Sequence, residues 1–137
     1  MGSDPARVAL KLANDARLVG GVGATVAFFA DNAGLDAAAQ AGMAGAAEQA
    51  CRETFPLLSS EDSTVDVLVE HLEDSIQVIL EHHGQPLPTA GLETFLVPGA
   101  EPVQGMSGLN LLASFDRVQY TTEGGASRMT LVKFLRR

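Results

Sequence analysis

The sequence has few of the residues on which several classes of protein depend. It holds one cysteine, no tryptophan, 5% aromatic residues and 9 Lys and Arg among 137 residues. A single cysteine forms no disulfide within the chain, and scarce aromatic side chains argue against a surface that stacks on bases. The 17 Asp and Glu bring the formal net charge to −8, whereas phosphate backbones are bound by clustered cations. We therefore expect no nucleic-acid partner.

Long apolar runs are also missing. No stretch approaches the roughly 20 consecutive apolar residues that a membrane-spanning helix needs, and the polar residues 1–5 show no signal-peptide pattern. We expect a cytoplasmic protein that does not enter the membrane. The composition, with 46% hydrophobic and 19% charged residues, is typical of a globular chain with a packed core. The length predicts a single domain over residues 1–137.

Hydrophobic periodicity predicts the order of the elements. The first helix is expected to take Asn14 as its N-cap and Gly34 as its stop. The pattern indicates an α+β protein, a two-layer α/β sandwich with helices packed on one face of a mixed, mostly antiparallel sheet. In chain order the elements expected are a strand at 7–12, helices at 15–32 and 36–55, a hairpin of 64–70 and 76–81, a long loop at 83–104, a short helix at 109–114 and a hairpin of 117–122 and 128–135.

A glycine-bracketed turn carries the clearest chemical signal. Gly105-Met106-Ser107-Gly108 leads into the short apolar helix. Glycines let backbone N–H groups approach an anion closely, and a helix N-terminus adds partial positive charge. The turn is thus a candidate phosphate site. A plain turn that uses glycine for its backbone conformation is the alternative interpretation.

Together with Asn14-Asp15-Ala16-Arg17-Leu18-Val19 and Thr130-Leu131-Val132-Lys133, this turn resembles the histidine-kinase-like ATPase (GHKL) superfamily, and within it the bacterial anti-sigma-factor serine kinases. The resemblance covers residues 9–135. It implies the histidine-kinase-like ATPase fold, with ATP and Mg²⁺ between the helices and a lid at about 85–104. The partners it implies are a sigma factor and a small anti-sigma antagonist of the STAS type. It also implies a possible homodimer.

The resemblance assigns candidate site residues to the second predicted helix. The family carries there a Glu that orients or deprotonates a hydroxyl and, four residues later, an Asn that helps to hold Mg²⁺. One alignment register places Gln49 and Glu53 at these positions, which makes Glu53 the candidate Mg²⁺ ligand. A register shifted by one makes Glu48 the catalytic carboxylate and places Arg52, which has no lone pair, at the metal position. Both registers remain open.

Other assignments concern the nucleotide. In the family an Asp-x-Gly turn follows a strand, and its carboxylate accepts a hydrogen bond from the adenine amino group. His82 stands at the position of that Asp, where a neutral imidazole accepts one hydrogen bond. The further residues that the resemblance places around the cofactor are Gly84 in the same turn, Gly105, Ser107 and Gly108 at the phosphates, and Thr130 near the adenine.

Two further interpretations concern the histidines and the cysteine. His71, His82 and His83 suggest a metal site, but neighbours along a strand point to opposite faces, so a solvated strand end is the favoured interpretation. Cys51 is expected to be a buried structural thiol.

Two functions follow from the resemblance. Positioning and metal electrostatics supply most of phosphoryl-transfer catalysis, and the family's base, metal ligand and adenine carboxylate are all replaced in this sequence. This favours a catalytically impaired pseudokinase, a binding module that acts through protein partners in a partner-switching system of transcription regulation. The alternative is an active ATP-dependent serine/threonine-protein kinase that phosphorylates an anti-sigma antagonist, in which Glu48 or Glu53 supplies the carboxylate.

Overall fold

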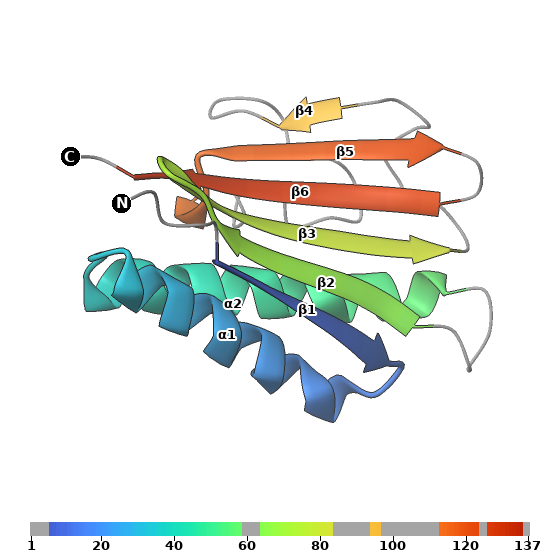
Figure 1. Ribbon diagram of the computed structural model, residues 1–137. Helices are drawn as coiled ribbons and strands as arrows, with labels where there is room; N and C mark the ends of the chain where they lie inside the picture. Colours follow the sequence, from blue (N-terminus) through green and yellow to red (C-terminus); the bar gives the residue numbers. More distant parts are fainter. Residues whose placement is uncertain (1–5, 59–63, 84–93, 97–112, 124–125, 136–137) are drawn as a thin grey trace.

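Figure 1 shows the computed structural model, which describes residues 6–58, 64–83, 94–96, 113–123 and 126–135. In the described part, two α-helices lie side by side on one face of an antiparallel sheet of five long strands and a short sixth, in the order β1-β2-β3-β6-β5-β4. The elements are β1 (Ala6–Ala13), a 3₁₀ turn (Ala16–Leu18), α1 (Val19–Asn32), α2 (Ala37–Thr54), a 3₁₀ turn (Phe55–Leu57), β2 (Thr64–His71), β3 (Ser75–His83), β4 (Thr94–Leu96), β5 (Arg117–Glu123) and β6 (Ala126–Phe134).

The α+β class and the helices on one face of the sheet are thereby confirmed. All strand pairs in the described ranges are antiparallel, so the mixed component expected from the sequence is not found there. The expected loop at 83–104 is wrong at two places, since β3 includes His83 and Thr94–Leu96 forms β4 against β5. The rest of that loop, and residues 109–112 of the expected short helix, lie outside the described residues.

The first helix begins differently from the expectation. Asp15, rather than Asn14, is the capping residue, because its carboxylate accepts the backbone N–H of Arg17 at 2.9 Å. The same carboxylate binds the Arg17 guanidinium, with Oδ2 and Nη2 2.7 Å apart. These bonds fix one 3₁₀ turn before α1 begins at Val19. The ion pair of Asp15 and Arg17 thus stabilises the turn from which α1 starts.

The link between the helices follows the sequence signals. Gly34 has a φ of 85°, a conformation that residues with a Cβ rarely adopt, and it ends α1 as expected. The backbone N–H of Leu35 then donates to the carbonyl of Ala30 at 3.0 Å. Asp36 starts α2, because its side chain accepts the N–H of Ala39 at 2.8 Å. This short, hydrogen-bonded link sets α1 and α2 beside each other.

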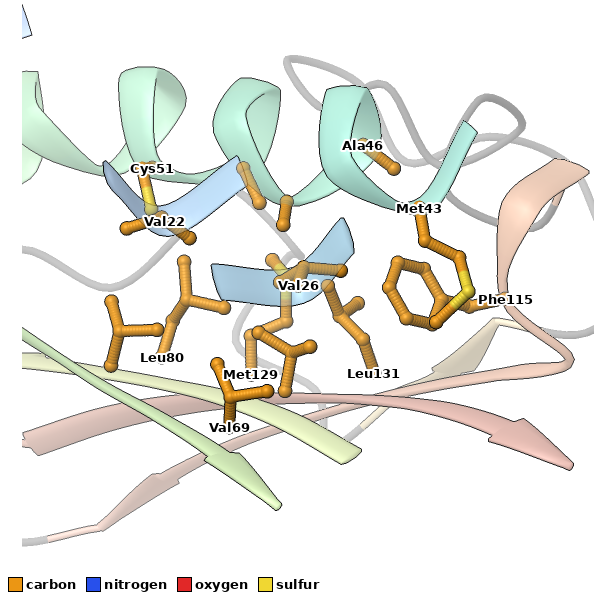
Figure 2. Packing of buried hydrophobic residues seen from close by; sticks show 14 of the residues in the cluster. Val22, Val26, Met43, Ala46, Cys51, Val69, Leu80, Phe115, Met129 and Leu131 are labelled. Carbon is orange, nitrogen blue, oxygen red and sulfur yellow. The ribbon is translucent and has the colours of Figure 1, made fainter. Parts of the chain in front are cut away.

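The core lies between the helices and the sheet (Figure 2). Alternate residues of β2, β3, β5 and β6 are buried toward the helices, and the small residues of α2 let its backbone come close to them. The strands therefore have a helix-facing side and an open side, which decides where each candidate residue lies. The largest buried core side chains include Val22 and Val26 of α1, Met43 of α2, Val65, Val67 and Val69 of β2, Ile76 and Leu80 of β3, Phe115, Tyr120 of β5 and Leu131 of β6.

Candidate functional site

The residues selected by the two alignment registers lie on different flanks of α2. Gln49 and Glu53 lie one turn apart, and the side-chain amide of Gln49 donates to Oε2 of Glu53 at 2.7 Å. Gly42 is two turns before Gln49 and shares its flank. A Cβ built on Gly42 would lie 2.9 Å from Oγ of Ser114. The early part of this flank, at Gly42, therefore lies against Ser114, in the segment that leads into β5.

Glu48 lies on the flank turned toward α1. Its side chain packs over Gly23 of α1, so closely that a Cβ on Gly23 would overlap the Glu48 carboxyl group. Oε1 of Glu48 is 3.3 Å from Nη2 of Arg52, one turn further along α2. Glu48 thus fills the seam between the helices and pairs with a cation. The structure does not bring Glu48 together with the Gln49 and Glu53 pair.

The chemistry available on the Gln49 flank is limited. Gln49 is an amide and accepts no proton at neutral pH. Glu53 is half-buried and offers carboxylate oxygens of the kind that Mg²⁺ prefers, but Oε2 already accepts the Gln49 amide. The described part of this flank therefore presents one carboxylate, Glu53, which is already hydrogen-bonded to the neighbouring amide.

Cys51 is buried on the core side of α2, which confirms the expectation of a buried thiol. Burial, followed by the negative charge of Glu48, raises the pKa of the Cys51 thiol to about 12. A thiol with this pKa stays protonated at neutral pH, whereas the thiolate is the nucleophile. Cys51 is therefore a packing residue.

His82 lies on the helix-facing side of β3, next to a residue that sequence reasoning missed. His82 is 3% exposed and stands directly opposite Ser127 of β6, which is 1% exposed. Oγ of Ser127 is 3.4 Å from Oγ1 of Thr122 on β5. The signal for Ser127 is the alternation of β6, where it shares its face with buried Met129. Because Ser127 is a polar residue at a helix-facing position of β6, the helix-facing side of the sheet is polar at this end.

Thr130 lies on the other side of the sheet. It pairs with Ile79 of β3 and Gln119 of β5, one residue out of phase with the buried Met129. Since neighbouring strand residues point to opposite faces, Thr130 lies on the open side. The structure therefore does not bring Thr130 and His82 to one site.

The remaining candidate residues of the nucleotide site cannot be placed with the others. Gly84, Gly105, Ser107 and Gly108 lie outside the described residues. Among the residues that are described, no group of three or more His, Cys, Asp and Glu is placed to hold a metal ion. Within the same ranges, no helix combines the length and the apolar character required to cross a membrane.

The open side of the sheet has a depression of about 560 Å³ that the sequence did not predict. Two neighbouring carboxylates, Asp66 and Glu81, stand opposite each other on β2 and β3. Nζ of Lys11 lies 3.5 Å from Asp66, and Nη2 of Arg128 lies 2.8 Å from Glu81. The two acidic and the two basic side chains beside the depression therefore pair with each other. The other lining residues are Ala9, Leu10, Val67, Leu68 and Ile79.

Comparison with known proteins assigns no family: no family model matches the sequence, and no curated protein matches it.

Proposed function

We propose that the chain is a GHKL-type regulatory domain, similar to an anti-sigma-factor kinase, that works as a binding module in a partner-switching system and is impaired in phosphoryl transfer. The observation that carries this proposal is the Gln49 and Glu53 pair, joined by a hydrogen bond of 2.7 Å. The order of elements, a strand, two helices and a hairpin, followed by a second hairpin, with both helices on one face, supports the family resemblance.

The residue at the family's base position is an amide, Gln49. In the family mechanism a Glu at the position of Gln49 orients or deprotonates the attacking serine hydroxyl, and positioned general bases contribute about 10²–10⁴ in rate. Gln49 has no proton acceptor of that strength, and its amide N–H is used by Glu53. Glu48, the nearest carboxylate along α2, is held over Gly23 by packing and by Arg52. In the described part of this flank the carboxylate that is left is Glu53, which lies one turn beyond the family's base position and already accepts a hydrogen bond from Gln49.

The residue at the family's metal-ligand position, Glu53, carries a negative charge. Glu53 replaces a neutral Asn, which adds a negative charge where the resemblance puts the phosphates, in a chain of net charge −8. Like charges at close range repel strongly in a partly desolvated setting. One carboxylate with one oxygen already hydrogen-bonded does not match the ligand set of Mg-ATP.

The residue at the family's adenine-binding position, His82, is buried. His82 is 3% exposed, so little of its ring is open to an adenine amino group. Ser127 lies directly opposite it on β6. The helix-facing end of β3 is therefore filled by protein side chains. This supports a domain that keeps its fold and its partner surfaces while the nucleotide site has changed.

The alternative, an active ATP-dependent serine kinase, retains one structural support. The half-buried carboxylate of Glu53 is a chemically suitable ligand for Mg²⁺ if Gln49 releases it. The two functions are separated by nucleotide binding and by phosphoryl transfer.

Thermal denaturation tests the role of the Gln49 and Glu53 pair. Millimolar Mg-ATP should leave the melting temperature of the natural chain unchanged. Ligand at about 100 times its Kd stabilises a protein by about 2.7 kcal/mol, or roughly 9 °C for a domain of this length. The double variant Gln49→Glu, Glu53→Asn, which restores the family pair, should gain part of that shift. Glu48→Gln, on the other flank, is the matched control and should gain none. A full shift with the natural chain would contradict the proposal.

Partner capture tests the binding function. The immobilised chain is incubated with extract of its native host, and bound proteins are identified by mass spectrometry. We expect a sigma factor or a small antagonist of the STAS type, retained equally with and without Mg-ATP. Failure to retain either class, or retention only with Mg-ATP, would refute the binding-module proposal.

A further inference from the structure

The two edges of the sheet differ in length. β4, at one edge, has three residues, whereas β1, at the other, has eight and contains no proline (Figure 1). The register of β1 with β2 runs without a bulge from Ala6 opposite His71 to Ala13 opposite Thr64, and among the described strands only β2 pairs with β1. Alternate residues of such an edge strand point their N–H and C=O groups away from the sheet. The outer edge of β1 therefore fits an extended chain that hydrogen-bonds to these groups.

The charged residues of β1 select the kind of chain. Arg7 and Lys11 lie on the open side of the sheet, and their side chains are 62% and 71% exposed. On the inner side, Nη2 of Arg7 lies 3.1 Å from Oε2 of Glu70, and Nζ of Lys11 lies 3.5 Å from Oδ1 of Asp66. A guanidinium has five N–H donors and an ammonium group three, so both keep donors for a second carboxylate. Opposite charges facing each other on neighbouring strands attract and like charges repel, which favours a strand with Asp or Glu opposite Arg7 and Lys11.

Ala9, between these two cations, opens onto the depression of about 560 Å³. It is exposed and stands opposite Leu68 of β2, which stands opposite Ile79 of β3. Leu68 and Ile79 are half-buried and line the depression. The side chain of Ala9 is a single methyl group, so a large side chain on a neighbouring strand passes over it and reaches Leu68. We therefore expect an aromatic anchor opposite Ala9.

The other side of β1 is apolar. Val8 and Leu10 stand opposite two buried residues of β2, Val69 and Val67, which places them on the helix-facing side. Val8 is 37% exposed and Leu10 is half-buried. Apolar side chains on an added strand cover this surface and are themselves removed from water. The residues that alternate with the acidic and aromatic ones are therefore expected to be apolar.

We propose that an extended segment of a partner protein adds to β1 as a further antiparallel strand. Five successive residues of this segment are acidic, apolar, aromatic, apolar and acidic, with the aromatic residue opposite Ala9. A second copy of this chain does not meet these requirements, because two β1 strands paired antiparallel about Ala9 bring Arg7 of one copy opposite Lys11 of the other. Binding at β1 does not depend on the proposed function, because Gln49 and Glu53 take no part in it.

Fluorescence anisotropy of a labelled peptide tests the proposal. The probe is the peptide Ser-Thr-Glu-Val-Phe-Val-Glu-Thr-Ser, titrated with the full chain. We expect a Kd of about 10–100 μM, because one short strand buries less than the roughly 800 Å² per partner of a standard interface. Replacing the phenylalanine with alanine, or both glutamates with lysine, should weaken binding at least about tenfold. Failure of the probe to bind, or equal binding of the three peptides, overturns the proposal.

Variants of the chain locate the site. Lys11→Glu should weaken binding of the probe at least about fivefold, and it should bind the lysine peptide better than the natural chain does. Ala9→Glu blocks the way into the depression and should abolish binding of the probe. Arg117→Glu removes an exposed cation of β5 on the same side of the sheet. It is the matched control and should bind the probe like the natural chain. Circular dichroism confirms that each variant is folded. Unchanged affinity in folded Lys11→Glu or Ala9→Glu, or an equal loss in Arg117→Glu, overturns the proposal.

Hydrogen exchange identifies the mode of binding. The probe should slow the exchange of the outward-pointing amides of β1, and raising the concentration of the chain alone should leave these amides unprotected. Binding of the probe without protection of β1 overturns the proposal. Protection that grows with the concentration of the chain alone assigns the edge to a second copy and overturns it as well.

Discussion

The seam between the two helices permits a sharp prediction at Gly23. The Glu48 side chain occupies the space into which a Cβ on Gly23 would point. Gly23→Ala should therefore displace Glu48, although alanine is the better helix former. Gly20→Ala, three residues earlier on the same helix, meets nothing within 4 Å and serves as the control.

The two substitutions should change the free energy of unfolding in opposite directions. Alanine in place of glycine stabilises a helix by about 0.5–1 kcal/mol, which should raise the melting temperature of Gly20→Ala by roughly 2–4 °C. At Gly23 the overlap with Glu48 is an overpacking, which typically destabilises by about 1–3 kcal/mol. The Glu48 side chain is 26% exposed and can move outward, but it then gives up its packing and the contact with Arg52. The net expectation is a loss of about 0.5–2 kcal/mol, or roughly 2–7 °C.

Thermal denaturation at low micromolar concentration measures both variants. Glu48→Ala removes the obstructing side chain, so Gly23→Ala added to Glu48→Ala should be neutral or stabilising. A Gly23→Ala variant that is as stable as Gly20→Ala would refute the placement of Glu48 in the seam. It would also reopen Glu48 as a candidate catalytic carboxylate.

Three further outcomes follow from single residues. The buried thiol of Cys51, whose pKa is raised to about 12, should react with a disulfide reagent at pH 8 at least about 100-fold more slowly than in urea, and rapid labelling of the native chain would contradict its burial. Asp36→Ala removes the N-cap of α2 and should lower the stability by about 1 kcal/mol in urea denaturation, whereas an unchanged midpoint would show that the cap is not formed. Hydrogen bonds from Arg17 lower the pKa of Asp15 from 3.8 to about 2. The stability that Asp15 contributes should thus be complete above about pH 4 and lost as the pH falls toward 2. NMR titration should show this pKa returning toward 3.8 in Arg17→Ala, and no change would disprove the pairing.

Local signals were sufficient to predict most of the fold. Apolar alternation located both hairpins, and Asp36 and Gly34 marked the helix boundaries, because capping and positive φ depend on one residue and its near neighbours. Asn14 and Asp15 are both good caps, and only the added bond to Arg17 favours Asp15. The three-residue strand β4 is too short for periodicity to show, and it depends on pairing with β5.

The candidate site was predicted less completely, because it depends on contacts between distant segments. The sequence alone did not decide between the alignment register that uses Glu48 and the one that uses Gln49. In the structure Glu48 packs on Gly23, which places it apart from Gln49. Ser127 was missed because its position beside His82 follows from the register of β3 with β6. No short turn joins β3 to β6, so their register depends on tertiary pairing between segments that are far apart in the sequence.

Phosphoryl transfer is the measurement that tests the account most directly. The purified chain, γ-labelled ATP, Mg²⁺ and the captured small antagonist are incubated together, and labelled serine is measured in the antagonist. The account predicts that the antagonist binds while no label is transferred, because Gln49 supplies no base and Glu53 is held by its amide. Transfer of label by the natural chain, abolished in Glu53→Ala, would contradict the binding-module account and establish the serine kinase.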